Sequence, residues 1–135
     1  VFGLTRDTGK DHIVKATLES LAYQSKDVLD AMQMDSGIQL KKLQVDGGAC
    51  ANDYLMQFQA DILDVEIERP DLIESTAVGA AYLAAYAIGL WSMEDIKEKR
   101  KVDKVFSSVK QDIWRKAKSS RWDEAVKRTL NWVEQ

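Results

Sequence analysis

The stretch that decides the fold is Leu43-Gln44-Val45-Asp46-Gly47-Gly48-Ala49-Cys50-Ala51-Asn52, in which an apolar run ends in an aspartate and two glycines. A helical pattern follows, so the stretch predicts a strand, a turn and a helix in succession. Glycine has no Cβ, which lets backbone approach a ligand closely, and a helix start offers unpaired N–H groups and partial positive charge. The stretch is a candidate nucleotide-binding turn, although a tight turn without a ligand has the same pattern.

The overall composition is that of a soluble globular protein with one domain. The 135 residues are 45% apolar and 30% charged, enough to bury a core. A net charge of −3 argues against a general nucleic-acid binder. Cys50 is the only cysteine, which fits a reducing compartment. The longest apolar-rich run, Ala77 to Trp91, is shorter than the ~20 residues of a membrane span. Because the first residue is valine, we expect a piece of a longer protein.

Around the glycines, the pattern predicts a parallel pair of strands. Lys42 to Val45 is typical of a buried strand, and the helix after Asn52 should run to about Leu63. Val65 to Glu68 alternates apolar and charged residues and should form a short strand that Arg69-Pro70 ends. Short links on both sides of the helix make the two strands parallel neighbours.

Helices account for most of the remaining chain. Thr8 and Asp11 resemble a capping box that opens a long helix ending at Gly37. A helix of small residues, which could lie close to a sheet or another helix, is expected over about residues 75–88 and should end at Gly89. Further expectations are a short helix over 93–100 capped by Ser92, a brief strand at Val105-Phe106, and a last helix over 112–132 that Ser119-Ser120 could interrupt.

No catalytic group is recognisable from the residues alone. His12, the only histidine, is expected to be a surface or capping residue. Cys50 should behave as a small apolar residue under the turn, with a reactive thiol as the alternative. The sequence has no Cys/His cluster with metal-ligand spacing and no Walker-type phosphate loop. The four tryptophans, at positions 91, 114, 122 and 132, are expected to be packing anchors.

Longer runs around the turn resemble a known family. Residues 45–63, VDGGACANDYLMQFQADIL, are similar to the adenosine-side segment near the C-terminus of the glycerol kinases. Glu68-Arg69-Pro70, then residues 74–84 (ESTAVGAAYLA) and Gly89-Leu90-Trp91, match that family in order and spacing, and residues 3–6 and 12–23 extend the match. The resemblance covers about residues 1 to 91, with a looser match in the last helix. The glycine turn alone points only to the wider carbohydrate-kinase superfamily.

This resemblance implies an α/β fold, part of a ribonuclease-H-like or actin-like ATPase domain with short parallel strands flanked by several helices. Residues 1–135 would be the C-terminal part of the second, nucleotide-binding domain of a two-domain kinase. The activity implied is transfer of phosphate from ATP to glycerol, with ADP as product, in a cleft shared with the N-terminal domain of the same protein. A cytoplasmic homo-oligomer, a dimer or a tetramer, is also implied.

Site residues are carried over only where the motif matches. Gly48 corresponds to the glycine near adenine and ribose, Asn52 to the asparagine at the helix start that reaches the nucleotide, and Gly47 and Ala49 complete the turn. Asp46 is expected to hold the turn. The catalytic base and the ligands of the Mg²⁺ expected with ATP would lie upstream, so the isolated chain should not phosphorylate glycerol.

Two other interpretations remain open from the sequence. The chain could belong to another sugar or polyol kinase of the same superfamily, or be a non-catalytic interaction module that uses the charged helix from Asp112 to Trp132. A two-stranded parallel ribbon is not independently stable. We therefore expect exposed apolar surface, and either self-association of the isolated chain or a place within a longer one.

Overall fold

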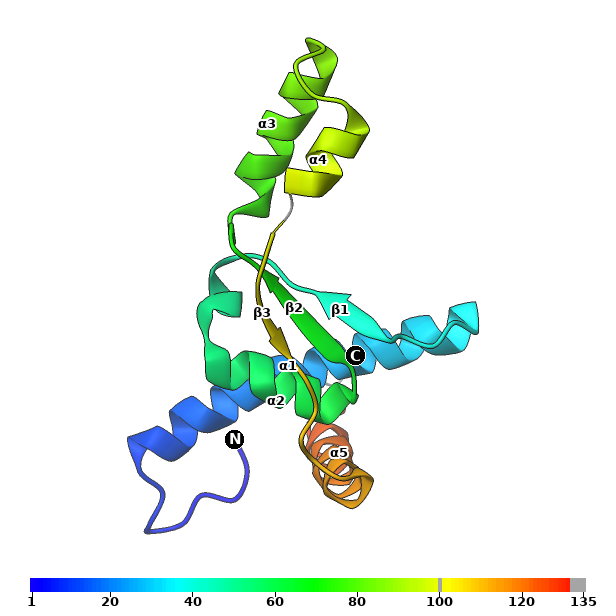
Figure 1. The fold of residues 1–135 in the computed structure, drawn as a ribbon. Coiled ribbons are helices and arrows are strands. Elements are labelled where there is room, and N and C mark those ends of the chain that lie inside the picture. The colour runs from blue at the N-terminus through cyan, green and yellow to red at the C-terminus, as the bar shows by residue number, and fades with distance from the viewer. Residues whose placement is uncertain (100, 132–135) are drawn as a thin grey trace.

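The computed structural model describes residues 1–99 and 101–131. In chain order the elements are α1 (Lys10–Ser36), β1 (Lys42–Gln44), the 3-10 helix η1 (Gly48–Ala51), α2 (Asp53–Leu63), β2 (Glu66–Pro70), α3 (Ser75–Ala87), α4 (Met93–Lys99), β3 (Val102–Phe106) and α5 (Asp112–Lys127) (Figure 1). None of the described helices is both long enough and apolar enough to cross a membrane.

Within residues 1–99 and 101–131 the sheet has three strands in the order β1-β2-β3. β1 and β2 are parallel, with Leu43 opposite Ile67, which confirms the pairing predicted from the short links. β3 runs antiparallel to β2 and places Phe106 opposite Ile67. β3 begins at Val102, earlier than the strand expected at Val105-Phe106. Because β3 pairs with β2, the predicted ribbon of two parallel strands becomes a mixed sheet of three.

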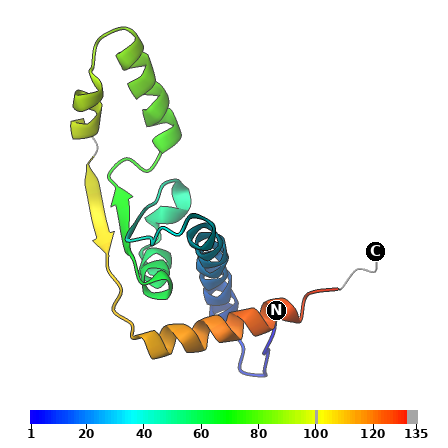
Figure 2. The ribbon, with the colours of Figure 1, turned by 90° about the vertical axis from the view of Figure 1, so that its right-hand side faces the viewer.

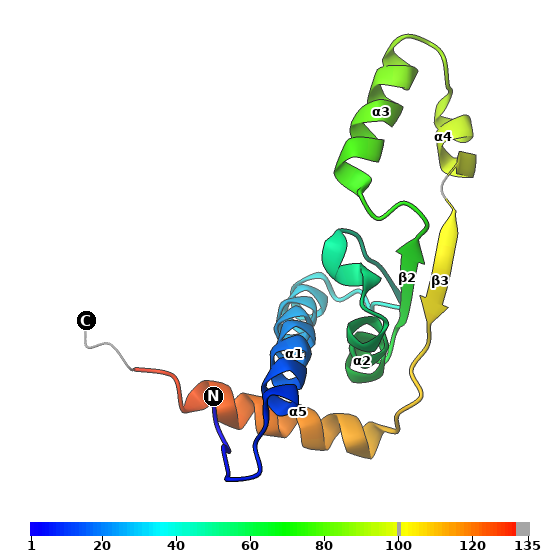
Figure 3. The same cartoon turned by 90° about the vertical axis from the view of Figure 1, so that its left-hand side faces the viewer.

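The core lies between the sheet and two helices. Side views show α2 against one face of the sheet and α1 beyond α2, so that sheet, α2 and α1 form successive layers (Figures 2 and 3). Ile62 and Ile67 are 1% and 0% exposed, and burying each stabilises the fold by about 1.5–3 kcal/mol. The buried cluster comprises Ala22, Tyr23, Cys50, Leu55, Met56, Phe58, Ala60, Ile62, Val65, Ile67 and Phe106.

Aromatic side chains attach α5 to this core. The Trp122 ring stacks on Tyr23 at a centroid distance of 5.1 Å, and the indole N–H donates to Asp27 at 2.7 Å. Trp114 meets Phe58 edge-to-face at 5.7 Å. Both tryptophans are therefore packing anchors, as predicted, whereas Trp132 lies outside the described residues. α5 is continuous through Ser119-Ser120, and its regular part ends at Lys127, before the expected Trp132.

Two predictions for the strands were wrong in detail. β1 was expected to be buried, but within the described chain it is an edge strand whose middle residue, Leu43, is only half-buried. Arg69-Pro70 was expected to end β2, yet both residues belong to it. The ladder tolerates the proline because its register is irregular between Arg69 and Pro70, and bulges are positions where proline is accepted.

The helix of small residues does not pack closely against the sheet. α3 and α4 form a projection beyond the end of β2 (Figure 1), and Ala85 is the only residue of α3 that is buried in the described structure. Leu83 is 70% exposed. In the described residues the aromatic contact of α3 is with the link to α4, where Trp91 meets Tyr82 edge-to-face at 5.8 Å.

Helix ends follow the predicted capping chemistry with one shift. α1 begins after Gly9 rather than Thr8, because His12 Nδ1 accepts the Gly9 N–H at 3.1 Å. His12 is thus a capping residue, as expected. Gly37 ends α1 with φ +68°. Ser92 caps α4 by exchanging hydrogen bonds with Asp95; Arg100, included in the predicted helix, lies outside the described residues.

Candidate functional site

The turn after β1 begins with a backbone conformation that only glycine adopts readily. Gly47 has φ +80° and ψ 169°, a region essentially restricted to glycine. Its N–H donates to the Ile73 carbonyl at 2.8 Å. That bond connects the start of the turn to the segment between β2 and α3, and so it fixes the position of the Gly47 backbone.

A single turn of 3-10 helix follows Gly47, and α2 then starts after Asn52 and runs to Leu63, as predicted. Cys50 N–H donates to the Gly47 carbonyl at 3.1 Å, and Asn52 N–H donates to the Ala49 carbonyl at 3.2 Å. Asn52 is then the N-cap of α2, because its Oδ1 accepts the Leu55 N–H at 3.0 Å. The asparagine therefore orients the start of α2, and its amide also carries two N–H donors.

The four predicted site residues lie along this one loop. Gly48, Ala49 and Asn52 are exposed and Gly47 is half-buried. A Cβ added at Gly48 would meet no atom within 4 Å, and its φ lies outside the range that favours glycine. Neither local backbone nor local packing therefore requires glycine at position 48. Small residues on an open backbone fit a flat group that must approach the chain closely.

Two grooves flank the turn. A groove of about 520 Å³ lies between the sheet end and the α3–α4 projection, lined by residues that include Val45, Asp46 and Ser75. A second one, of about 380 Å³, lies between α1 and the turn and includes Asp46 and Ala49. Gly48 and Asn52 line neither of them. In the described part of the chain, Gly48 and Asn52 therefore lie on the exposed surface between the two grooves, which we call the open wall.

Asp46 ties this wall to α3. Its Oδ2 accepts the Ser75 hydroxyl at the first residue of α3. This contact agrees with the prediction that Asp46 holds the turn.

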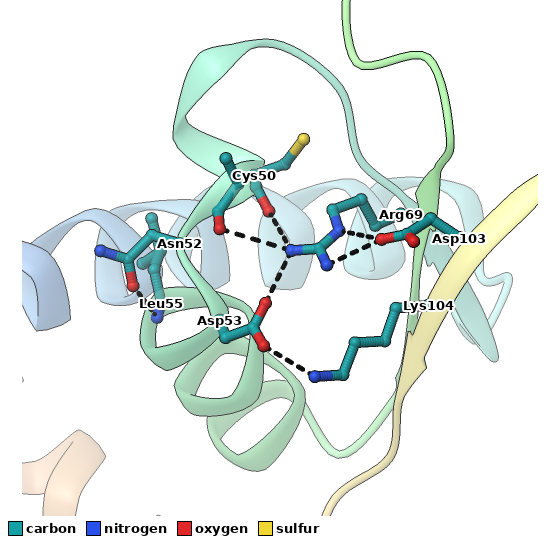
Figure 4. A network of polar contacts seen from close by, with 8 residues as sticks. Cys50, Asn52, Asp53, Leu55, Arg69, Asp103 and Lys104 are labelled. Carbon is teal, nitrogen blue, oxygen red and sulfur yellow. Dashed lines mark hydrogen bonds and ion pairs between the residues drawn. The ribbon is translucent and has the colours of Figure 1, made fainter.

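Arg69, which was expected to end a strand and belongs to the Glu68-Arg69-Pro70 match, joins β2, η1, α2 and β3 behind the turn (Figure 4). Arg69 Nη1 donates to the Cys50 carbonyl at 3.1 Å and to the Ala51 carbonyl at 3.4 Å, the last residues of η1. The guanidinium also contacts Asp53 of α2 at 2.7 Å and Asp103 of β3 at 2.7 Å. The feature of the sequence that could have pointed to this role is an arginine at the end of a strand with buried residues.

Ion pairs and hydrogen bonds within this network shift the pKa values of Asp53 and Arg69. Hydrogen bonds from Lys104 and then from Arg69 lower the pKa of the Asp53 carboxyl below its usual 3.8. Hydrogen bonds to Asp53 and Asp103 raise the pKa of the Arg69 guanidinium above its ordinary value. The carboxyl of Asp53 is therefore held in its charged form beside Arg69 and Lys104.

The remaining candidate nucleophile is inert. Cys50 is 1% exposed, and burial raises the pKa of its thiol, with Arg69 opposing the effect. The prediction of a small apolar residue under the turn is confirmed, since a reactive cysteine needs exposure and a lowered pKa. In residues 1–99 and 101–131, no group of three or more His, Cys, Asp or Glu side chains is placed to hold a metal ion.

Comparison with known proteins identifies close relatives. The C-terminal domain of the FGGY family of carbohydrate kinases matches residues 1–88. Proteins named glycerol kinase from Alkaliphilus metalliredigens and Haemophilus influenzae are 53% and 52% identical to the chain, over 98% and 100% of its length. The chain spans 27% of the length of each of these two relatives.

Solved structures of carbohydrate kinases have the same fold as this chain. A Plasmodium falciparum glycerol kinase with ADP matches 98% of this chain and 27% of its own, with a TM-score of 0.84 and 39% identity. A xylulose kinase from Lactobacillus acidophilus matches 96% of this chain and 26% of its own, with a TM-score of 0.71 and 22% identity. At that identity the second likeness speaks for the fold alone. Together they confirm the predicted α/β fold class, part of an actin-like ATPase domain.

Proposed function

Since the chain belongs to the FGGY family of carbohydrate kinases, we propose that it is the C-terminal part of the nucleotide-binding domain of a glycerol kinase. The complete protein would transfer the γ-phosphoryl group of ATP to the terminal hydroxyl of glycerol, giving glycerol 3-phosphate and ADP. Identity supports glycerol over other substrates, because it is 39% to the solved glycerol kinase and between 20% and 26% to the solved xylulose and gluconate kinases.

The observation that carries the proposal is the open turn from Gly47 to Asn52. Gly48 and Ala49 present little more than backbone to solvent, and a side chain at Gly48 would enter empty space. In our proposal these two residues form the wall against which the adenosine of ATP or ADP lies. Asn52, fixed by its bond to the Leu55 N–H, holds its amide donors toward the nucleotide, and Gly47 sets the direction of the turn.

The chemistry itself would take place on residues outside this chain. Phosphoryl transfer depends on positioning and on electrostatic stabilisation of the transferred group, which needs both walls of a cleft. We propose that the N-terminal domain of the same protein supplies the base and the opposite wall. Mg²⁺ would accompany the nucleotide, bound through its phosphates and carboxylates elsewhere. No catalytic residue is assigned within residues 1–135.

We further propose that the complete protein is a homo-oligomer of the cytoplasm. Apolar side chains on α1 such as Val28 and Met32 are 60% and 59% exposed, and apolar surface of this kind is normally covered by another domain or subunit. The single buried thiol of Cys50 suits a reducing compartment.

An ADP titration of the full-length protein tests the proposal. Gly48→Trp fills the open side of the turn and should weaken ADP binding at least about tenfold, the equivalent of 1.4 kcal/mol. Ala117→Trp, on the exposed surface of α5, adds the same side chain away from the turn and should change affinity less than about twofold. Unchanged ADP affinity in a folded Gly48→Trp protein would remove the nucleotide assignment.

A further inference from the structure

The loop that carries the proposed adenosine wall is short of internal support. η1 has four residues, and the last carbonyls of a helix have no partner within it. A 3-10 helix also has poorer hydrogen-bond geometry than an α-helix, and two consecutive glycines add conformational freedom. Something outside the loop must therefore keep Gly48 and Ala49 in one arrangement.

Two contacts from other segments supply that support. At the entrance, the Gly47 N–H is bonded to Ile73. At the exit, the Arg69 guanidinium donates to the carbonyls of Cys50 and Ala51, immediately before Asn52. The Arg69 side chain is only 13% exposed; its bond to the Cys50 carbonyl is partly buried, whereas its bond to the Ala51 carbonyl lies at the surface.

The guanidinium is itself held from two sides. One carboxylate oxygen of Asp103 on β3, Oδ2, accepts from Nε at 2.8 Å and lies 2.7 Å from Nη2. Asp53, the first residue of α2, accepts from Nη1 and also binds Lys104. The ring of Phe106 lies 5.4 Å from the guanidinium carbon. Figure 4 shows the fork between the loop and β3, with Asp103 opposite the two carbonyls.

Only arginine meets all of these partners at once. Its planar fork carries five N–H donors, whereas lysine offers a single compact charge with three. An ammonium group placed between Asp53 and Asp103 could not also reach both carbonyls of η1 with the same geometry. The contact pattern is therefore specific to the shape of the group as well as to its charge.

We propose that Arg69 is a positioning residue for the nucleotide site: it clamps the end of η1 to β2 and β3 and so holds Gly48, Ala49 and Asn52 in the arrangement that receives adenosine. Arg69 acts through the loop and does not touch the nucleotide. The inference rests on the proposed function, because the arrangement matters only if the loop binds ATP. Loss of the clamp should affect nucleotide binding and leave glycerol binding intact.

The test uses the full-length protein and separates the two substrates. Arg69→Gln should raise the KM for ATP and the Kd for ADP about tenfold, with the KM for glycerol changed less than about twofold. Arg69→Lys should fall between wild type and Arg69→Gln. Arg128→Gln is the matched control, because Arg128, the C-cap of α5, has a side chain that is 61% exposed and whose described ion pair is with Glu124. It should leave all three constants unchanged.

The outcomes are distinguishable. If Arg69→Gln lowers the melting temperature but leaves the KM for ATP and the Kd for ADP at wild-type values, Arg69 is merely structural and the inference is overturned. The same holds if both substrates lose affinity equally. If Gly48→Trp fails to weaken ADP binding, the proposed nucleotide site is itself wrong. If Arg69→Gln does not fold, Arg69→Lys and Asp103→Asn give the answer: a selective rise in the KM for ATP supports the clamp, and no rise refutes it.

Discussion

Replacing each of the two adjacent glycines by alanine separates backbone strain from every other effect at the turn. Gly47 has φ +80° and ψ 169°, whereas the φ of Gly48 lies outside the positive range, and a Cβ at either position meets no atom within 4 Å. Steric clashes therefore contribute to neither variant. Both substitutions also reduce the freedom of the unfolded chain, by about 0.4–1 kcal/mol each, and this contribution cancels when the variants are compared.

What remains is the cost of placing alanine in the conformation of Gly47, of order 1–3 kcal/mol. Gly47→Ala should thus be less stable than Gly48→Ala by about 1–3 kcal/mol. Urea unfolding of the 135-residue chain, followed by tryptophan fluorescence, measures the difference as a shift in midpoint at constant slope. Equal midpoints for the two variants would show that the turn relaxes around Gly47 and would refute the reasoning.

Further predictions concern the cap, the aromatic anchor, the buried phenol and the isolated chain. Asn52→Ala removes the oxygen that accepts the Leu55 N–H and should cost about 1 kcal/mol, while Asn52→Asp keeps an acceptor and should restore most of it; urea midpoints decide. Trp122→Phe retains an aromatic ring against Tyr23 but loses the hydrogen bond to Asp27, so it should lower the free energy of unfolding by about 1.5–3 kcal/mol. Trp122→Ala also loses the ring, and if it were no less stable than Trp122→Phe the reasoning would be contradicted. Burial, with Glu19 adding to it, raises the pKa of Tyr23 from 10.0 to about 12; because the unfolded chain ionises first, stability should fall as pH rises between those values, and absorbance titration of wild type against Tyr23→Phe checks it. The purified 135-residue chain should form no ADP in a glycerol-dependent manner, and detection of such activity would overturn the placement of the base outside it.

The sequence was most informative where local chemistry and tertiary structure agree. The parallel strands on either side of α2, the glycine stop after α1 and the serine cap of α4 all follow from short-range rules of spacing and capping. The predicted site residues occupy one continuous loop, because the motif is itself continuous. Its arrangement could therefore be expected without knowledge of any long-range contact.

What the sequence did not reveal depends on contacts between distant segments. Arg69 approaches η1 only because β2 runs beside β1, and its partner Asp103 comes from a strand whose start was not recognised. The charged residues in Val102-Asp103-Lys104 hid that strand from a search for apolar alternation. α3 illustrates the converse: its small residues predicted close packing, yet in the described part of the chain Ala85 is the only buried residue of this helix.

Amide hydrogen exchange on the full-length protein tests the central claim most directly, because it shows which backbone segments ADP covers. On adding saturating ADP, the account predicts slower exchange in peptides that contain residues 47–53 and no change in peptides from α5, residues 112–127. Protection elsewhere in the protein together with unchanged exchange at residues 47–53 would contradict the assignment of this turn to the nucleotide.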